Sequence, residues 1–195
     1  MVYRIVFGEV AFRPIVGSAL GGLNTEVVGG IYRGKNSRDS NFVDYSHACS
    51  KSNGSPNGIV FEPREIFRLQ TVYGPCLGWF HSHHRSRYMK DGIRVVRDGP
   101  SLPSDDDLDL HRDSFSSFFG LVIALNPRRR VLSLENKGRV VRGYVNCERR
   151  HYAYEIGAFY LDGFAKAGRL RRAEICVPKG IMEEIAKSPD FLKKE

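Results

Sequence analysis

The sequence lacks most of the features that would place this chain outside the ordinary globular class. It has only four cysteines among 195 residues, and no two of them form a C-x-x-C pair. No apolar run approaches the roughly 20 residues that a helix needs to cross a bilayer, and the first residues lack the apolar core of a signal peptide. We therefore expect a cytoplasmic chain with no membrane segment, whose thiols stay reduced and packed rather than forming disulfides or a cysteine zinc site.

Negative charge is in deficit, because 22 acidic residues face 30 lysines and arginines, which gives a net charge of +8. Many of the arginines fall in short clusters, such as Arg128–Arg130 and Arg169–Arg172. Such clusters suit an acidic partner, either a protein or a nucleic acid, and they equally suit a solvated basic surface. No nucleic-acid-binding motif accompanies them, so nucleic-acid binding is an alternative without motif support.

The pattern of apolar residues predicts one domain that mixes strands and helices, with no internal repeat. Strands are expected within 2–12, 26–34, 41–47, 59–61, 77–82, 118–125, 131–134, 139–145 and 175–177. Helices are expected at about 15–20, 62–69, 104–115, 148–166 and 179–186. Because strands and helices do not alternate in a regular βαβ rhythm, we expect an α+β fold around a single sheet.

Two histidines separated by one residue end an apolar run, Gly78-Trp79-Phe80-His81-Ser82-His83. Strand side chains alternate between the two faces, so both imidazoles are expected on one face. A carboxylate from a helix start can complete a three-ligand metal site with one open position, the usual form of a catalytic zinc centre. The segment Pro103-Ser104-Asp105-Asp106-Asp107 offers such a helix start. This constellation predicts a hydrolase.

The order Glu26, His81-Ser82-His83, Ser104 and Asp107 resembles the JAMM (MPN+) metallopeptidases, whose pattern is a glutamate, then His-Ser/Thr-His, then Ser-x-x-Asp. The similarity covers roughly residues 5–126. It implies a single mixed, curved β-sheet flanked by helices, the MPN or cytidine-deaminase-like architecture, with a catalytic domain over 1–134. Residues 135–195 are expected to form a C-terminal extension of strands and helices packed on the same domain.

The resemblance also implies a role for each residue of the pattern. His81, His83 and Asp107 would bind Zn²⁺, which suits two neutral imidazoles and a carboxylate. Glu26 would act as a general base and then as an acid, and Ser104 would donate a hydrogen bond to the oxyanion of the tetrahedral intermediate. Taken without the histidines, Ser104 and Asp107 also fit a helix-capping pair, and Glu26 fits an exposed carboxylate at the end of a strand.

Two features depart from the family pattern. Twenty residues separate His83 from Ser104, far more than the family usually has, and two Asp-Gly dipeptides predict a hairpin in this insertion. The hairpin would serve as a lid, as an edge for an extended peptide, or only as a decorative loop. The second departure is His84, in place of the usual proline, which is predicted to face away from the pair and not to bind the metal. His111, one helical turn after Asp107, is expected to be exposed rather than to support that carboxylate.

The leading hypothesis is a zinc-dependent isopeptidase that hydrolyses the amide between the C-terminus of a ubiquitin-like protein and a target lysine. The resemblance supplies this substrate class, whereas the residues themselves indicate only amide hydrolysis. One alternative is a JAMM peptidase that processes a linear precursor or a peptide. Another is a non-catalytic MPN scaffold or a basic nucleic-acid-binding protein. No feature of the sequence predicts an oligomeric state.

Overall fold

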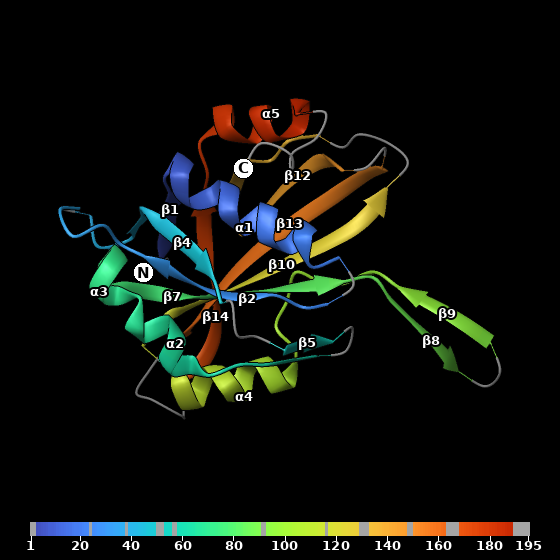
Figure 1. Ribbon diagram of the computed structural model, residues 1–195, viewed down its shortest axis with the longest axis horizontal. Coiled ribbons are helices and arrows are strands. Elements are labelled where there is room, and N and C mark those ends of the chain that lie inside the picture. Colours follow the sequence, from blue (N-terminus) through green and yellow to red (C-terminus); the bar gives the residue numbers. More distant parts are fainter. Residues whose placement is uncertain are drawn as a thin grey trace.

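A mixed, curved sheet forms the centre of the computed structural model, with helices on both of its faces (Figure 1). The structure describes residues 3–23, 25–37, 39–49, 53–55, 58–90, 93–115, 117–128, 133–147, 150–162 and 168–188. In sheet order the strands are β3 (Phe42–Val43), β1 (Arg4–Phe7), β14 (Arg169–Cys176), β13 (Arg150–Asp162), β10 (Phe119–Arg128), β7 (Cys76–His84), β2 (Val28–Tyr32) and β4 (Tyr45–Ala48). This architecture confirms the predicted α+β class and the curved sheet flanked by helices.

Two further strands branch from this sheet, and four belong to small hairpins. The branching strands are β11 (Lys137–Gly138), which pairs with β14, and β12 (Val140–Cys147), which pairs with β13. The hairpins are β5 (Asn53–Ser55) with β6 (Gly58–Val60), and β8 (Ser86–Lys90) with β9 (Ile93–Arg97). The helices are α1 (Glu9–Gly21), α2 (Pro63–Arg68), α3 (Gln70–Tyr73), α4 (Asp105–Ser114) and α5 (Lys179–Lys187).

The sheet separates two hydrophobic clusters, because the side chains of each strand alternate between its faces. Figure 1 shows α1 and α5 on one side of the sheet and α2 and α4 on the other. Phe80 belongs to the cluster that includes residues of α1 and α5. Its neighbour Trp79 belongs to the second cluster, together with Phe115 at the end of α4. His81 and His83 have the same parity as Trp79 and therefore lie on the α4 face.

Helix α1 begins at Glu9, six residues before the helix predicted at about 15–20, and Pro14, which was expected to occupy its first turn, lies inside it. Its buried residues, Ala11, Phe12, Ile15, Val16, Ala19 and Leu20, follow the three-and-four spacing of an amphipathic helix on both sides of the proline. The strand predicted within 2–12 is correspondingly short and ends at Phe7. The apolar face, rather than the proline, therefore decides where this helix begins.

The largest difference from the predicted elements lies over residues 148–166, which were expected to be mainly helical. The 13-residue strand β13 occupies Arg150–Asp162. It pairs with β10 along one edge, and with β12 and then β14 along the other. A strand covered on both faces shows a continuous apolar run, which periodicity alone cannot distinguish from a buried helix.

Strand β10 also runs further than predicted, through Pro127 to Arg128. Its pairing with β7 ends at Leu125 and His84, while its pairing with β13 continues to Arg128 and His151. Pro127 lacks an N–H group and is accommodated where one edge of the strand has no β7 partner. Of the strand predicted at 131–134, residues 131 and 132 lie outside the described residues, and Leu134 is not in a strand.

The hairpin predicted in the insertion between His83 and Ser104 is confirmed. Strands β8 and β9 pair antiparallel, from Ser86 with Arg97 to Lys90 with Ile93. The hairpin projects beyond the end of β7 and away from the main sheet (Figure 1). The insertion therefore places a separate two-stranded element beside the end of the strand that carries the histidines.

All four cysteines lie in the described part of the chain, and none forms a disulfide, as predicted. Burial raises the pKa of the Cys76 thiol to about 11 and that of Cys49 to about 12, so both stay protonated at neutral pH. Among the described residues, every helix is too short or too polar to span a membrane.

Close packing around Gly29 of β2 leads to a stability prediction. A Cβ atom added at Gly29 would overlap the His47 carbonyl oxygen of β4 and the Phe80 ring of β7. We expect Gly29→Ala to lower the free energy of unfolding by about 1–3 kcal/mol, because overpacking shifts both neighbouring strands. Chemical denaturation measures this change. Gly180→Ala is the matched control, since nothing lies within 4 Å of a Cβ at that position; an equal loss in both variants would contradict the explanation.

Candidate metal centre

Three side chains from β7 and α4 meet at one point. His81 Nε2 lies 3.0 Å from His83 Nε2 and 3.1 Å from Asp107 Oδ2, and His83 Nε2 lies 3.3 Å from the same oxygen. Ligands of a tetrahedral zinc ion with bonds of about 2.0–2.1 Å are separated by about 3.3 Å. The three atoms therefore have the spacing of one face of a tetrahedral site, and this group can hold a metal ion.

Strand geometry sets the position of the two imidazoles. β7 lies between β2 and β10, so its backbone is held on both edges. His81 is fully buried, and its ring stacks on the Trp79 indole with a centroid distance of 4.8 Å and an interplanar angle of 13°. His83 is 9% exposed. His81 is thus closed off from solvent, whereas His83 keeps a small exposed area.

The carboxylate comes from the first turn of α4. Ser104 caps this helix, because its Oγ accepts a hydrogen bond from the Asp107 backbone N–H at 3.2 Å. The Ser104 backbone N–H and hydroxyl both donate to Asp107 Oδ2 at 2.7 Å. This capping box turns the carboxylate back over the helix start and toward the histidines. The structure thus shows the capping arrangement that the sequence had left as an alternative, and it places the Ser104 hydroxyl beside the ligand carboxylate.

The protonation states suit a cation. Burial lowers the pKa of His81 and favours its neutral form. Burial alone would raise the pKa of Asp107, but hydrogen bonds from His81, His83 and Ser104 outweigh it, so the pKa falls and the carboxyl is ionised. Burial lowers the pKa of His83, but the hydrogen bond and the charge of Asp107 outweigh burial and raise that pKa above its usual value. A cation between the three groups would replace this proton, so the donor set fits a divalent metal.

A hydrogen bond orients one of the two imidazoles from behind. His83 Nδ1 lies 3.0 Å from the Pro100 carbonyl oxygen. A carbonyl can only accept, so Nδ1 carries a hydrogen, and once a cation replaces the proton on Nε2 the lone pair of that nitrogen is directed at the site. His81 Nδ1 is buried and has no hydrogen-bond partner among the described residues. The orientation of His81 therefore depends on its stacking against Trp79.

Glu26 is held next to this group by the pairing of β2 with β7. Val28 pairs with His81 in the antiparallel ladder, so continuing the register by two residues places Glu26 opposite His83. The Ser82 N–H donates to the Val27 carbonyl at 2.9 Å, and the Ser82 Oγ accepts from the Val27 N–H at 2.9 Å. These two hydrogen bonds extend the contact between the strands toward Glu26. Burial raises the pKa of Glu26 to about 7, the positive charge of His83 opposes this rise, and the Asp107 charge adds to it. Residues opposite each other across strands share a face, so the carboxyl lies on the face of the site.

The neighbouring His84 lies on the opposite face of β7, as predicted, with its Nε2 atom 3.1 Å from Ser82 Oγ. The expectation that His111 is exposed was wrong. His111 is fully buried, and its Nδ1 atom accepts a hydrogen bond from Trp79 Nε1 at 2.9 Å. A buried tryptophan usually needs an acceptor, and this need is the signal that could have indicated His111.

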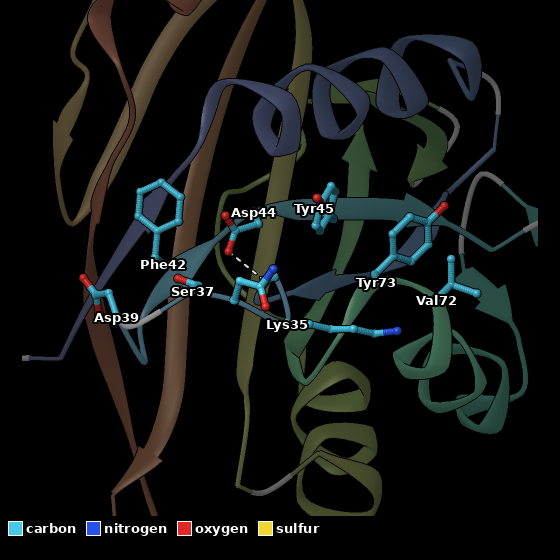
Figure 2. A pocket seen from close by; sticks show the side chains of 10 residues that line it. Lys35, Ser37, Asp39, Phe42, Asp44, Tyr45, Val72 and Tyr73 are labelled. Atoms are coloured by element: carbon cyan, nitrogen blue, oxygen red, sulfur yellow. Dashed lines mark hydrogen bonds between the residues drawn. The ribbon is translucent and has the colours of Figure 1, made fainter.

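A cavity of about 680 Å³ lies elsewhere on the molecule (Figure 2). None of the three ligand residues lines it. Its lining includes Asp44, whose carboxylate accepts a hydrogen bond from the Gly34 N–H at 2.6 Å, and the rings of Tyr45 and Tyr73, which face each other at 5.6 Å. The full lining is Gly34, Lys35, Asn36, Ser37, Asp39, Phe42, Asp44, Tyr45, Val72 and Tyr73. The cavity contributes no side chain to the metal group.

Comparison of the sequence with models of known protein families gives no match, and comparison with curated proteins also finds none. The resemblance to the JAMM metallopeptidases therefore stays an expectation from the residue pattern.

The first prediction for this site concerns metal binding. We expect the purified protein to bind about one Zn²⁺, and His81→Ala to weaken binding by more than about 100-fold, beyond the 10–100-fold typical of residues that only support a ligand. A competition titration with a chelating dye measures the affinity. Trp79 is the only tryptophan and stacks on His81, so quenching of its fluorescence by Co²⁺ reports occupancy independently. The matched control is His151→Ala, at an exposed position of β13; equal losses in both variants would refute the assignment.

The second prediction concerns pH. Burial and the neighbouring Arg112 charge lower the pKa of His111 to about 4, whereas an unfolded histidine titrates near about 6.5. As the pH falls, the unfolded chain binds the proton first, so stability present above about pH 6.5 is lost progressively toward pH 4. We expect His111→Gln to remove this part of the pH dependence in denaturation curves recorded with a chelator. This account would be contradicted if the wild type and His111→Gln lost equal stability between pH 7 and pH 5.

Proposed function

We propose that this chain is a zinc-dependent isopeptidase of the JAMM type, which hydrolyses the amide between the C-terminus of a ubiquitin-like protein and a target lysine. The observation that carries the proposal is the convergence of His81, His83 and Asp107 within 3.3 Å of one another. Glu26 comes opposite His83 when the β2–β7 register is continued by two residues from Val28 and His81. Two imidazoles and one carboxylate are a common ligand set of hydrolytic zinc sites.

Zinc, when bound, would acidify water and polarise the scissile carbonyl. The chain supplies the groups that hold it, His81, His83 and Asp107, and the group that moves the proton. Glu26 would take a proton from the attacking water on its carboxylate as the new C–O bond forms. It would then give that proton to the lysine nitrogen as the C–N bond breaks. One carboxyl thus returns to its starting state after each turnover.

Ser104 would contribute a hydrogen bond to the oxyanion. Its hydroxyl now donates to Asp107 Oδ2, while the Ser104 backbone N–H donates to the same oxygen. Rotation of the hydroxyl toward substrate would leave Asp107 with the backbone donor, so the carboxylate would keep its orientation. A donor aimed at a developing oxyanion typically contributes about 10²–10³ in rate.

The insertion supports a substrate with an extended tail. The β8–β9 hairpin begins directly after the histidines and ends before Ser104, so it leaves the fold at the end of β7, the strand that carries the histidines (Figure 1). An extended C-terminal tail can add to the edge of such a hairpin through main-chain hydrogen bonds. The C-terminus of a ubiquitin-like protein is a segment of this kind, which favours a protein-conjugate substrate over a compact one.

The catalytic assignment predicts the behaviour of Glu26→Gln. This variant keeps the size of the side chain but cannot accept the proton, so we expect cleavage to fall by about 10²–10⁴-fold while Zn²⁺ affinity is retained. The assay is cleavage of a lysine-linked conjugate of a ubiquitin-like protein beside a linear fusion of the same protein. Glu9→Gln, at an exposed position of α1, is the control that should cleave normally.

Full activity in Glu26→Gln would rule out Glu26 as the general base. Preferential cleavage of the linear fusion would instead assign the chain to precursor processing. A zinc-loaded protein that cleaves neither substrate would favour a non-catalytic scaffold.

A further inference from the structure

The insertion returns to the main fold through three residues, Asp98-Gly99-Pro100, which we call the return segment. Its first two residues are the second of the two Asp-Gly dipeptides, and they follow the end of β9 at Arg97. Each residue of the return segment makes a different contact with the body of the protein. Together these contacts connect the end of β10 to the ligand His83.

The central contact is a pair of hydrogen bonds between Asn126 of β10 and the backbone of Gly99. Asn126 Oδ1 accepts from the Gly99 N–H at 3.0 Å, and Asn126 Nδ2 donates to the Gly99 carbonyl at 3.1 Å. Asn126 is only 5% exposed. Its amide therefore satisfies both backbone groups of Gly99, as a neighbouring strand would, and it fixes that residue in two directions.

Gly99 also lies directly against the strand that carries the histidines. A Cβ atom at this position would lie 2.8 Å from both the carbonyl carbon and the oxygen of His83, and 3.0 Å from the His84 oxygen. These are backbone atoms and cannot move aside like the end of a flexible side chain. Only glycine allows Asn126 to hold the return segment this close to β7.

The residues on either side of Gly99 complete the arrangement. Asp98 Oδ1 accepts from Arg85 Nε at 2.8 Å, and Asp98 Oδ2 pairs with Arg128 Nη1 at 2.8 Å. These ion pairs are partly exposed, so each adds little stability, but they join the two ends of the insertion to the end of β10. On the other side, the Pro100 carbonyl accepts from His83 Nδ1 at 3.0 Å.

We propose that Asn126 is a positioning residue for the metal ligand His83, acting through Gly99 and the Pro100 carbonyl. By holding the return segment against β7, Asn126 keeps this carbonyl at the back of the imidazole. The carbonyl in turn keeps the hydrogen on Nδ1 and the Nε2 lone pair on the metal side. The inference rests on the metal site of the proposed function but requires no particular substrate.

The test is the affinity of the full chain for Zn²⁺ alone, measured by competition with a chelating dye. We expect Asn126→Ala to weaken binding by about 10-fold, the lower end of the range for residues that support a ligand. The matched control is Leu125→Ala, the preceding residue of β10, whose side chain is buried in the cluster on the other face. This variant loses stability through a cavity, and its zinc affinity should be unchanged.

A second readout separates positioning from a general loss of structure. Long-range ¹H–¹⁵N spectra of the metal-free protein, recorded at an alkaline pH at which the His83 imidazole is neutral, report which imidazole nitrogen carries the hydrogen. We expect His83 to be in the Nδ1–H form in the wild type and in Leu125→Ala, and to populate both tautomers in Asn126→Ala. If Asn126→Ala does not fold, Asp98→Asn decides the question, since it removes the charge that pairs with Arg85 and Arg128 on a partly exposed side chain. Its expected loss of affinity is about 2–5-fold, as for the loss of partly exposed ion pairs.

The outcomes distinguish this inference from the proposed function. A wild type that binds no zinc would remove the metal site, and with it the proposed function. Only the positioning role would be overturned if the wild type binds zinc and Asn126→Ala keeps both the zinc affinity and the His83 tautomer of the wild type. The same result in Asp98→Asn would overturn it if Asn126→Ala does not fold. Equal losses of affinity in Asn126→Ala and Leu125→Ala would also overturn it, because instability would then explain both.

Discussion

The alternation of side chains along β7 is the constraint on which the rest of the structure depends. Phe80 and Ser82 point to one face, where Phe80 packs in the cluster with α1 and α5. Trp79, His81 and His83 point to the other. The same strand therefore anchors a hydrophobic core and presents two imidazoles side by side. Because β2 and β10 hold both of its edges, the imidazoles have little freedom to separate.

Burial of this polar group is balanced by charge and hydrogen bonding around one oxygen atom. Asp107 Oδ2 lies within hydrogen-bond or ion-pair distance of the two imidazoles and of the Ser104 N–H and hydroxyl. An ionised carboxylate with several donors is stabilised inside a protein, so the negative charge is retained at the centre of the group. That retained charge is what a divalent cation requires.

Much of the site could be predicted from local pattern, and most of its surroundings could not. The family resemblance carried by the order of Glu26, the two histidines and Asp107 predicted that these side chains lie together, while strand parity and helix capping, which are local rules, predicted the shared face of the histidines and the helix start at Asp107. His111 was expected to be exposed, and Asn126 lies just beyond the strand predicted within 118–125, so no role was predicted for it. The contacts of these residues, with Trp79 and with Gly99, join segments more than 25 residues apart. The strand β13 was mistaken for a helix because its neighbours cover both of its faces.

The amino-acid sequence by itself determined the shared face of His81 and His83 and the helix start that holds Asp107, because both follow from the backbone within a few residues. Tertiary structure alone decided that these two elements meet within 3.3 Å. It also decided that Pro100 lies behind His83 and that Glu26 lies opposite it. Those positions depend on strand pairing and on the path of a long insertion, which follow from packing between segments far apart in the chain.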